Sequence, residues 1–152
     1  MTEIKWLPKN IYCHKRHDCF IRRNGEYNLD LDDDIRYREN FIEEIVSEAK
    51  KHQNCITTIA SNKMIYNGNT LVKENVSQKV SCQNNYMGGR SCFPPYLIPV
   101  GYFYDKKLNW FRDTYVQKCD EAWIRGLALK FDIMVNAIYS WKCYKFDTIE
   151  ET

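Results

Sequence analysis

Apolar positions in the first half of the chain recur at three- and four-residue steps, the spacing of one helix face. They are Ile35, Phe41, Ile42, Ile45, Val46 and Ala49. Asp32 or Asp33 can serve as the N-cap, and Lys50, Lys51 and His52 favour the negative end of the helix dipole. This pattern predicts an amphipathic helix over about residues 32–53.

A second stripe follows Tyr104 and predicts a helix over about residues 105–126, with Asp105 at its start. The stripe consists of Leu108, Phe111, Tyr115, Cys119, Ala122, Trp123 and Gly126. Such spacing is typical of a surface that packs on a core. We therefore expect Phe111 and Tyr115 to be buried.

Between the two predicted helices the chain is rich in β-branched and aromatic residues, at 55–60, 63–66 and 70–72. Asn67-Gly68 is a strong hairpin signal. We predict a small antiparallel sheet here, and hence an α+β fold. Residues 73–95 read as a long loop, 96–104 as an edge strand or a bend, and 131–139 as either a short helix or a pair of strands.

The length of 152 residues favours a single domain, 1–152. Residues 1–31 read as an irregular basic segment with one short strand at 19–21, and residues 148–152 as a frayed tail. Hydrophobic residues make up 44% and charged residues 28%, which is ordinary globular composition. Disorder over most of the chain is thereby disfavoured.

No apolar stretch is long enough to span a bilayer, and the first residues lack the apolar region of a secretory signal. We expect an intracellular protein, in cytoplasm or nucleus, that does not enter a membrane. In that reducing environment we expect the seven cysteines to be thiols, buried small residues or metal ligands. For a secreted product they would instead read as three bridges and one free thiol.

Positive charge gathers early in the chain, at His14-Lys15-Arg16-His17 and at Arg22-Arg23. With Tyr12 and Phe20 this segment could hold phosphates and stack a base, as single-strand binders do. A solvated surface loop is the alternative. Cys13, His17 and Cys19 could also bind zinc, although their spacing does not follow the usual pattern of structural zinc sites.

Glu39 is the acid that the predicted first helix places beside its apolar stripe, within ~20° of Val46. A carboxylate there would be partly desolvated, which raises its pKa and suits it to proton transfer. The alternative is a rim residue paired with Arg36 or Arg38. We find no phosphate loop, dinucleotide fingerprint or nucleophile elbow.

Four segments together resemble the phage-type pyrimidine-dimer DNA glycosylases, the endonuclease V family. Residues 100–106, Val-Gly-Tyr-Phe-Tyr-Asp-Lys, are similar to the start of that family's second helix, and Glu121-Ala122-x-x-Arg125-Gly126 to its end. Tyr37-Arg38-Glu39 is similar to the segment that carries the catalytic glutamate. Met1-Thr2 matches a start at which removal of methionine exposes a threonine amine.

The resemblance implies a DNA-repair enzyme, a lesion-specific glycosylase and AP lyase that needs no cofactor. The Thr2 amine would attack the sugar C1′ to form an imine, and Glu39 would manage the protons. Phosphates would be held by arginines of this chain, namely Arg16, Arg22, Arg23, Arg38 and Arg125. The alternative is a non-enzymatic, virus- or phage-encoded binding protein that engages a host protein or nucleic acid through its eleven tyrosines and four tryptophans.

Overall fold

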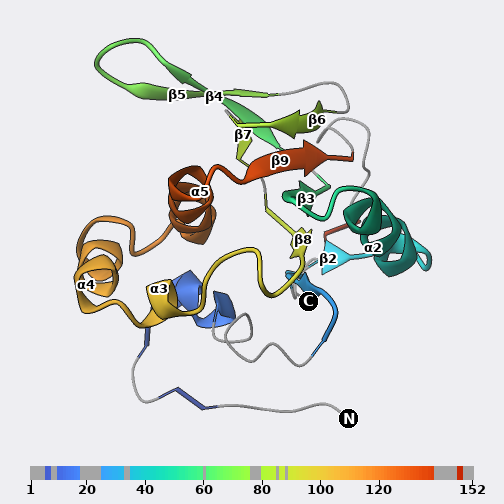
Figure 1. Ribbon diagram of the computed structural model, residues 1–152, viewed down its shortest axis with the longest axis horizontal. Coiled ribbons are helices and arrows are strands. Elements are labelled where there is room, and N and C mark those ends of the chain that lie inside the picture. Colours follow the sequence, from blue (N-terminus) through green and yellow to red (C-terminus); the bar gives the residue numbers. More distant parts are fainter. Residues whose placement is uncertain are drawn as a thin grey trace.

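The protein is seen here in a computed structural model, which describes residues 6–7, 10–17, 25–32, 35–59, 61–75, 80–84, 86–87, 89–138 and 147–148. The predicted strand at 19–21 and residues 149–152 of the predicted tail lie outside this part of the chain. Helices and sheets are both present, so the predicted α+β class is confirmed (Figure 1).

A mixed five-stranded sheet forms the centre of the fold. Its order is β1 (Asn28–Leu29), β8 (Ser91–Phe93), β3 (Cys55–Thr58), β9 (Met134–Ala137) and β6 (Val80–Gln83). β3 and β9 run parallel, from Cys55 opposite Met134 to Thr58 opposite Ala137, whereas the other pairs are antiparallel. Every residue of β3 and β8 is buried, as expected of strands covered on both faces.

A three-stranded sheet carries the predicted hairpin, in the order β5 (Leu71–Asn75), β4 (Asn62–Tyr66) and β7 (Tyr86–Met87). The turn is at Asn67-Gly68, as predicted. Asn67 Oδ1 accepts from the Thr70 N–H at 3.0 Å, and Gly68 has φ +92°, which favours glycine. The predicted loop at 73–95 is wrong, because β6, β7 and β8 all lie within it.

The first predicted helix starts nine residues later than expected. α2 spans Phe41–Lys51 with Asn40 at its N-cap position, whereas Ile35–Arg36 form β2. This strand pairs with β10 (Asp147–Thr148), so Thr148 belongs to a strand and not to a frayed end. The pairing draws 35–36 into extended backbone, which overrides the helical spacing. α2 packs on the β3 and β8 side of the large sheet (Figure 1).

The second predicted helix is divided into two, and a further short helix lies before it, within the segment 96–104 that was expected to be an edge strand or a bend. α3 spans Gly101–Tyr104, α4 spans Lys106–Tyr115 and α5 spans Asp120–Lys130. Asp105 caps α4 as predicted, and its Oδ1 accepts from Lys107 N at 2.8 Å and from Leu108 N at 3.0 Å. The helical backbone is interrupted at residues 116–119. The prediction of one continuous helix over 105–126 is therefore wrong.

Two apolar clusters make the core. The larger one joins α5 to the sheet and to α3, through Ile56, Phe93, Ile98, Phe103, Trp123, Ile124, Leu127, Ala128 and Ile133. The smaller one lies under α2 and contains Phe41, Ile45, Ala49, Ile59, Cys92 and Ile138. Residues 131–138 hold a single strand, β9, because it pairs along its length with buried β3.

Candidate functional site

Several predicted site residues lie outside the described part of the chain, namely Thr2, Cys19, Arg22 and Arg23. The backbone of Arg16 and His17 belongs to a short 3-10 helix, η1 (Tyr12–His17). The side chains of these two residues lie outside the described part of the structure. The proposed catalytic amine and most of the proposed phosphate contacts therefore stay predictions.

Glu39 does not lie on an apolar helix face, which corrects the geometry predicted for it. It occupies the turn before α2 and is exposed. Arg38 is likewise exposed, and its Nη2 lies 3.7 Å from Glu44 Oε2, at ion-pair distance. Because α2 begins only at Phe41, the desolvation expected of Glu39 is absent.

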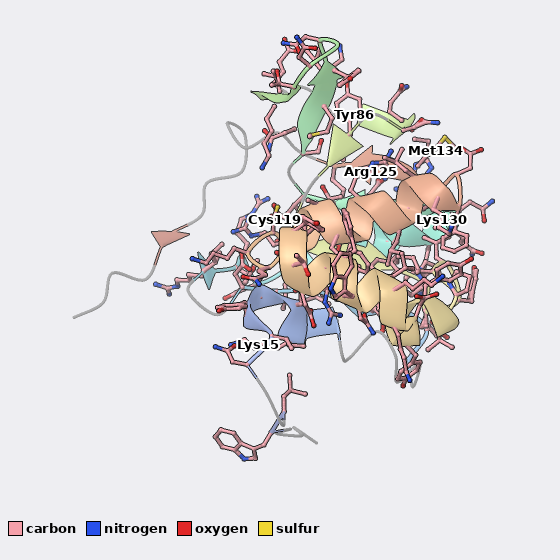
Figure 2. The ribbon with its side chains drawn as sticks, turned by 90° about the vertical axis from the view of Figure 1, so that its left-hand side faces the viewer. Lys15, Tyr86, Cys119, Arg125, Lys130 and Met134 are labelled. Atoms are coloured by element: carbon pink, nitrogen blue, oxygen red, sulfur yellow. The ribbon has the colours of Figure 1, made fainter. Side chains whose placement is uncertain are left out.

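Arg125 is buried, so its predicted role as a phosphate contact is wrong. The side chain is 6% exposed on α5, and Nη1 donates to the Ile133 carbonyl at 2.9 Å. Figure 2 shows it where α5 meets the strands. Burial lowers the pKa of the guanidinium. This buried hydrogen bond thus connects α5 to Ile133, the residue that precedes β9.

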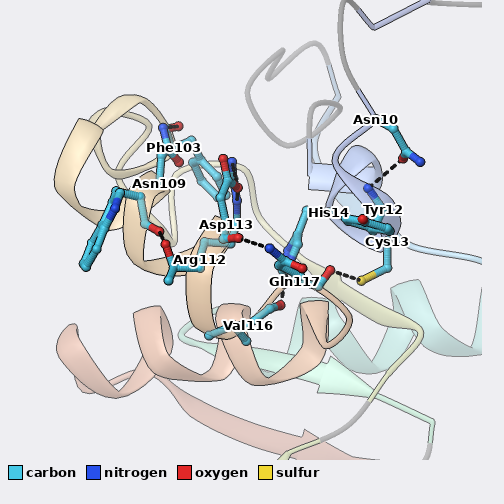
Figure 3. Close-up of polar contacts among 12 residues, drawn as sticks. Asn10, Tyr12, Cys13, His14, Phe103, Asn109, Arg112, Asp113, Val116 and Gln117 are labelled. Carbon is cyan, nitrogen blue, oxygen red and sulfur yellow. Dashed lines mark hydrogen bonds and ion pairs between the residues drawn. The ribbon is translucent and has the colours of Figure 1, made fainter.

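The basic N-terminal segment meets the end of α4 through His14 and through Cys13, one of the three candidate zinc ligands (Figure 3). His14 is 2% exposed, and its Nε2 donates to the Val116 carbonyl at 2.7 Å. Cys13 Sγ donates to the Gln117 carbonyl at 3.7 Å. Burial raises the pKa of Cys13 and lowers that of His14. No group of three His, Cys, Asp or Glu among the described residues could hold a metal ion.

The outer face of α3 and α4 carries four large exposed aromatic side chains. Tyr104, Trp110, Phe111 and Tyr115 have exposed fractions between 47% and 66%. Trp110 and Tyr115 meet edge to face with ring centroids 5.7 Å apart, and Phe111 and Tyr115 lie 5.2 Å apart. We call Trp110, Phe111 and Tyr115 the aromatic face. The prediction that Phe111 and Tyr115 are buried is therefore wrong.

Three lysines lie at the two ends of the aromatic face. Lys106, Lys107 and Lys118 are exposed, and none of them forms an ion pair with a carboxylate of the described residues. Arg112 points inward and bonds Asp113 Oδ1 through Nε at 2.8 Å and Nη2 at 2.7 Å. Asp105 is occupied as the N-cap of α4. Asp105 and Asp113 are thus engaged in these contacts, whereas the three lysines are exposed.

Lys15 adds a further cation near this surface. It is exposed on η1, whose neighbouring residues Cys13 and His14 bond the carbonyls of 116 and 117 directly after the aromatic face. Part of the predicted basic segment therefore lies beside α4 (Figure 2).

A separate open cleft of about 590 Å³ is lined by Gly25, Glu26, Tyr27, Lys50, Gln53, Pro94, Pro95 and Tyr96. Its charged residues are one lysine and one glutamate, whereas lysines lie at both ends of the aromatic face.

Comparisons of this chain with protein-family models, with curated proteins and with solved structures find no match. The described residues form no helix with the length and apolar character needed to cross a bilayer.

Proposed function

We propose that this protein binds single-stranded DNA, with the aromatic face of α4 as the surface on which bases stack. The observation that carries the proposal is the presence of three touching, exposed rings beside lysines that have no described acidic partner. A contiguous exposed apolar patch of this kind usually marks an interaction site.

The ring geometry supports stacking. Trp110 and Tyr115 are almost perpendicular, at 84°, so the edge of one ring meets the face of the other. Such a pair leaves further ring faces open, and a base can stack on them. Each base stacked on an aromatic side chain contributes about 1–3 kcal/mol.

The charges favour a nucleic acid over a host protein. Lys106 and Lys107 lie on the first turn of α4 and Lys118 follows its end, so cations flank the rings at both ends of the helix. Phosphates spaced along a strand could meet these ammonium groups while the intervening bases stack. A protein hot spot would instead pair its charges within the interface, because unpaired buried charges are costly.

Binding of a fluorescent oligothymidylate, measured by anisotropy, tests the proposal. Trp110→Ala is expected to weaken binding by roughly 5- to 150-fold, which corresponds to the loss of one stacked base. Tyr66→Ala is the matched control, since Tyr66 is 70% exposed but lies on β4. Replacing Lys106 and Lys107 with alanine should lower the salt dependence of log K by about 0.7 for each phosphate that these lysines neutralise.

Two results would refute single-strand binding. One is the absence of salt-dependent anisotropy change with folded protein at micromolar concentration. The other is equal weakening by Tyr66→Ala and Trp110→Ala. Stoichiometric capture of a host protein that Trp110→Ala abolishes, without any DNA binding, would favour the protein-binding alternative.

Lesion glycosylase and lyase activity is a narrower candidate within the same DNA-binding function. It is supported by the family resemblance and by the capped helix start at Asp105. Borohydride trapping on abasic-site DNA tests it: we expect a covalent adduct on the Thr2 amine of processed protein, and loss of the adduct in Glu39→Gln. DNA binding without any adduct would reject the enzyme and leave the binding function intact.

A further inference from the structure

Two cysteines and a histidine from three different elements meet at one end of the large sheet. His52 is the C-cap residue of α2, Cys55 is the first residue of β3, and Cys82 lies in β6. The two Sγ atoms are 2.8 Å apart, and Cys82 Sγ is 3.5 Å from His52 Nδ1. The sequence offers no motif for this group, because 27 positions separate the cysteines.

An irregularity in β6 brings Cys82 to this position. The register of β6 against β9 shifts between Val80 and Gln83, and Cys82 has φ +46°, in the left-handed region. Cys55 is opposite Met134 and Gln83 is opposite Val135, so both thiols lie at the same end of β9. Bulges of this kind reorient side chains and are common at functional sites.

The two thiols differ in their surroundings. Cys55 is 2% exposed, and burial, with a smaller contribution from Cys82, raises its pKa to about 12. Cys82 is only partly buried and has the imidazole beside it. His52 Nε2 in turn lies 4.0 Å from Glu48 Oε2, so the imidazole is placed between the thiol and a carboxylate. Cys82 is therefore the thiol with both solvent access and a base.

The sulfur separation argues against a metal ion at this place. Two thiolates on tetrahedral zinc, each about 2.3 Å from the metal, are held roughly 3.8 Å apart. The observed 2.8 Å is much shorter. The distance between the two sulfur atoms is shorter than a non-bonded sulfur contact and longer than the ~2.05 Å bond of a disulfide.

We propose that Cys82 and Cys55 form a peroxide-sensitive thiol pair that closes to a disulfide, with His52 as the base for Cys82. In the first step the Cys82 proton passes to His52, and the thiolate attacks one oxygen of a hydroperoxide. The O–O bond breaks, the leaving oxygen takes the proton from His52, and Cys82 becomes a sulfenic acid.

In the second step Cys55 sulfur attacks Cys82 sulfur. The S–O bond breaks, and the hydroxide leaves with the Cys55 proton as water. The two thiols lose two electrons in total and the hydroperoxide gains them. The products are one disulfide, one water and one alcohol, or a second water when the oxidant is hydrogen peroxide. The new bond would link β3 to β6, the strands that precede and follow the β4 and β5 hairpin along the chain.

Peptide mapping of the full chain after hydrogen peroxide treatment at pH 7 tests the proposal. Trypsin places Cys55 in the peptide 52–63 and Cys82 in the peptide 80–90, and each contains one cysteine. We expect these two peptides to be joined after oxidation and separated again by dithiothreitol. Cys82→Ser should abolish the joined pair, whereas Cys92→Ser, at a buried cysteine outside the group, should not.

Two further variants test the order of steps. Cys55→Ser should leave a sulfenic acid on Cys82 that dimedone traps. His52→Gln should slow disulfide formation by up to about 30-fold, because an ordinary thiol is only about 3% ionised at pH 7. The proposal is overturned if folded, oxidised protein lacks the joined pair, if the Cys92 peptide 91–106 is joined as readily, or if His52→Gln leaves the rate unchanged. Stoichiometric zinc bound by these three residues would also overturn it.

Discussion

Protonation of His14 should destabilise the protein below about pH 6.5. The imidazole is 2% exposed, and its Nε2 donates to the Val116 carbonyl at 2.7 Å. Burial is the main cause of its lowered pKa. The nearby Arg112 adds to it, whereas the Val116 carbonyl, Asp120 and Asp113 act in the opposite direction. The folded state therefore holds His14 neutral at a pH where the unfolded chain already binds a proton.

The size of the effect follows from linkage. Above pH 6.5 His14 is neutral in both states and the free energy of unfolding has its full value. As the pH falls below 6.5 the unfolded state takes up the proton first, so stability drops by up to about 1.4 kcal/mol per pH unit. The loss ends once the pH passes the folded pKa. With a urea m-value of about 2 kcal/mol per molar, the midpoint should move by about 0.7 M per pH unit.

Urea unfolding followed by tryptophan fluorescence between pH 5.5 and 7.0 measures this slope. His14→Gln is the informative variant, because its amide can still donate to Val116 but does not titrate. The other histidines are present in both proteins, so their contributions cancel in the comparison. The variant should show the smaller slope with pH, and parallel slopes for the two proteins would refute the assignment of the effect to His14.

Two further predictions concern α4 and the core beneath α2. Asp105→Ala should lower the unfolding free energy by about 0.5–2 kcal/mol in a urea titration, because two N–H groups of the first turn lose their acceptor, whereas Asp105→Asn should cost less. An equal cost for both variants would contradict the capping role. Ile45→Ala should cost about 2–5 kcal/mol because the side chain is fully buried in the smaller cluster, whereas exposed Ile42→Ala should stay within about 0.5 kcal/mol. Similar losses at the two positions would contradict the observed orientation of α2.

Local signals in the sequence predicted those features that depend on neighbouring residues. The Asn67-Gly68 turn and the Asp105 cap are set by their own hydrogen bonds, and both were predictable. The start of α2 was not, because Ile35 pairs with Thr148 at the far end of the chain. Helical spacing at 35–36 gives no information about such a partner. The strands within 73–95 escaped prediction for the same reason, since Cys92 pairs with Leu29 and Thr57.

The candidate sites likewise separate into features that neighbouring residues determine and features that depend on distant parts of the chain. Aromatic richness could be read from composition, but which rings face outward depends on packing. The thiol pair was not predictable, because it needs the shifted register of β6 and the turn after α2 to bring Cys82 to His52. The desolvation predicted for Glu39 depends on a helix that begins after it. The resemblance implies a phosphate contact for Arg125, whereas its guanidinium donates to the Ile133 carbonyl inside the fold.

The orientation of α4 explains why its aromatic residues remain outside. The predicted stripe continued from Leu108 to Phe111 and Tyr115, whereas the observed inner face runs from Leu108 to Arg112 and Val116, at steps of four. Arg112 can be accommodated there because Asp113 neutralises it.

Val116 closes the inner face, and its carbonyl is taken by His14. The helix ends at this point, and the chain turns into α5 instead of continuing the stripe to Trp123. The N-terminal segment thus fixes the end of the helix whose opposite face we propose as the DNA-binding surface. A variant that loosens η1 should therefore weaken DNA binding without removing any ring or lysine from that surface.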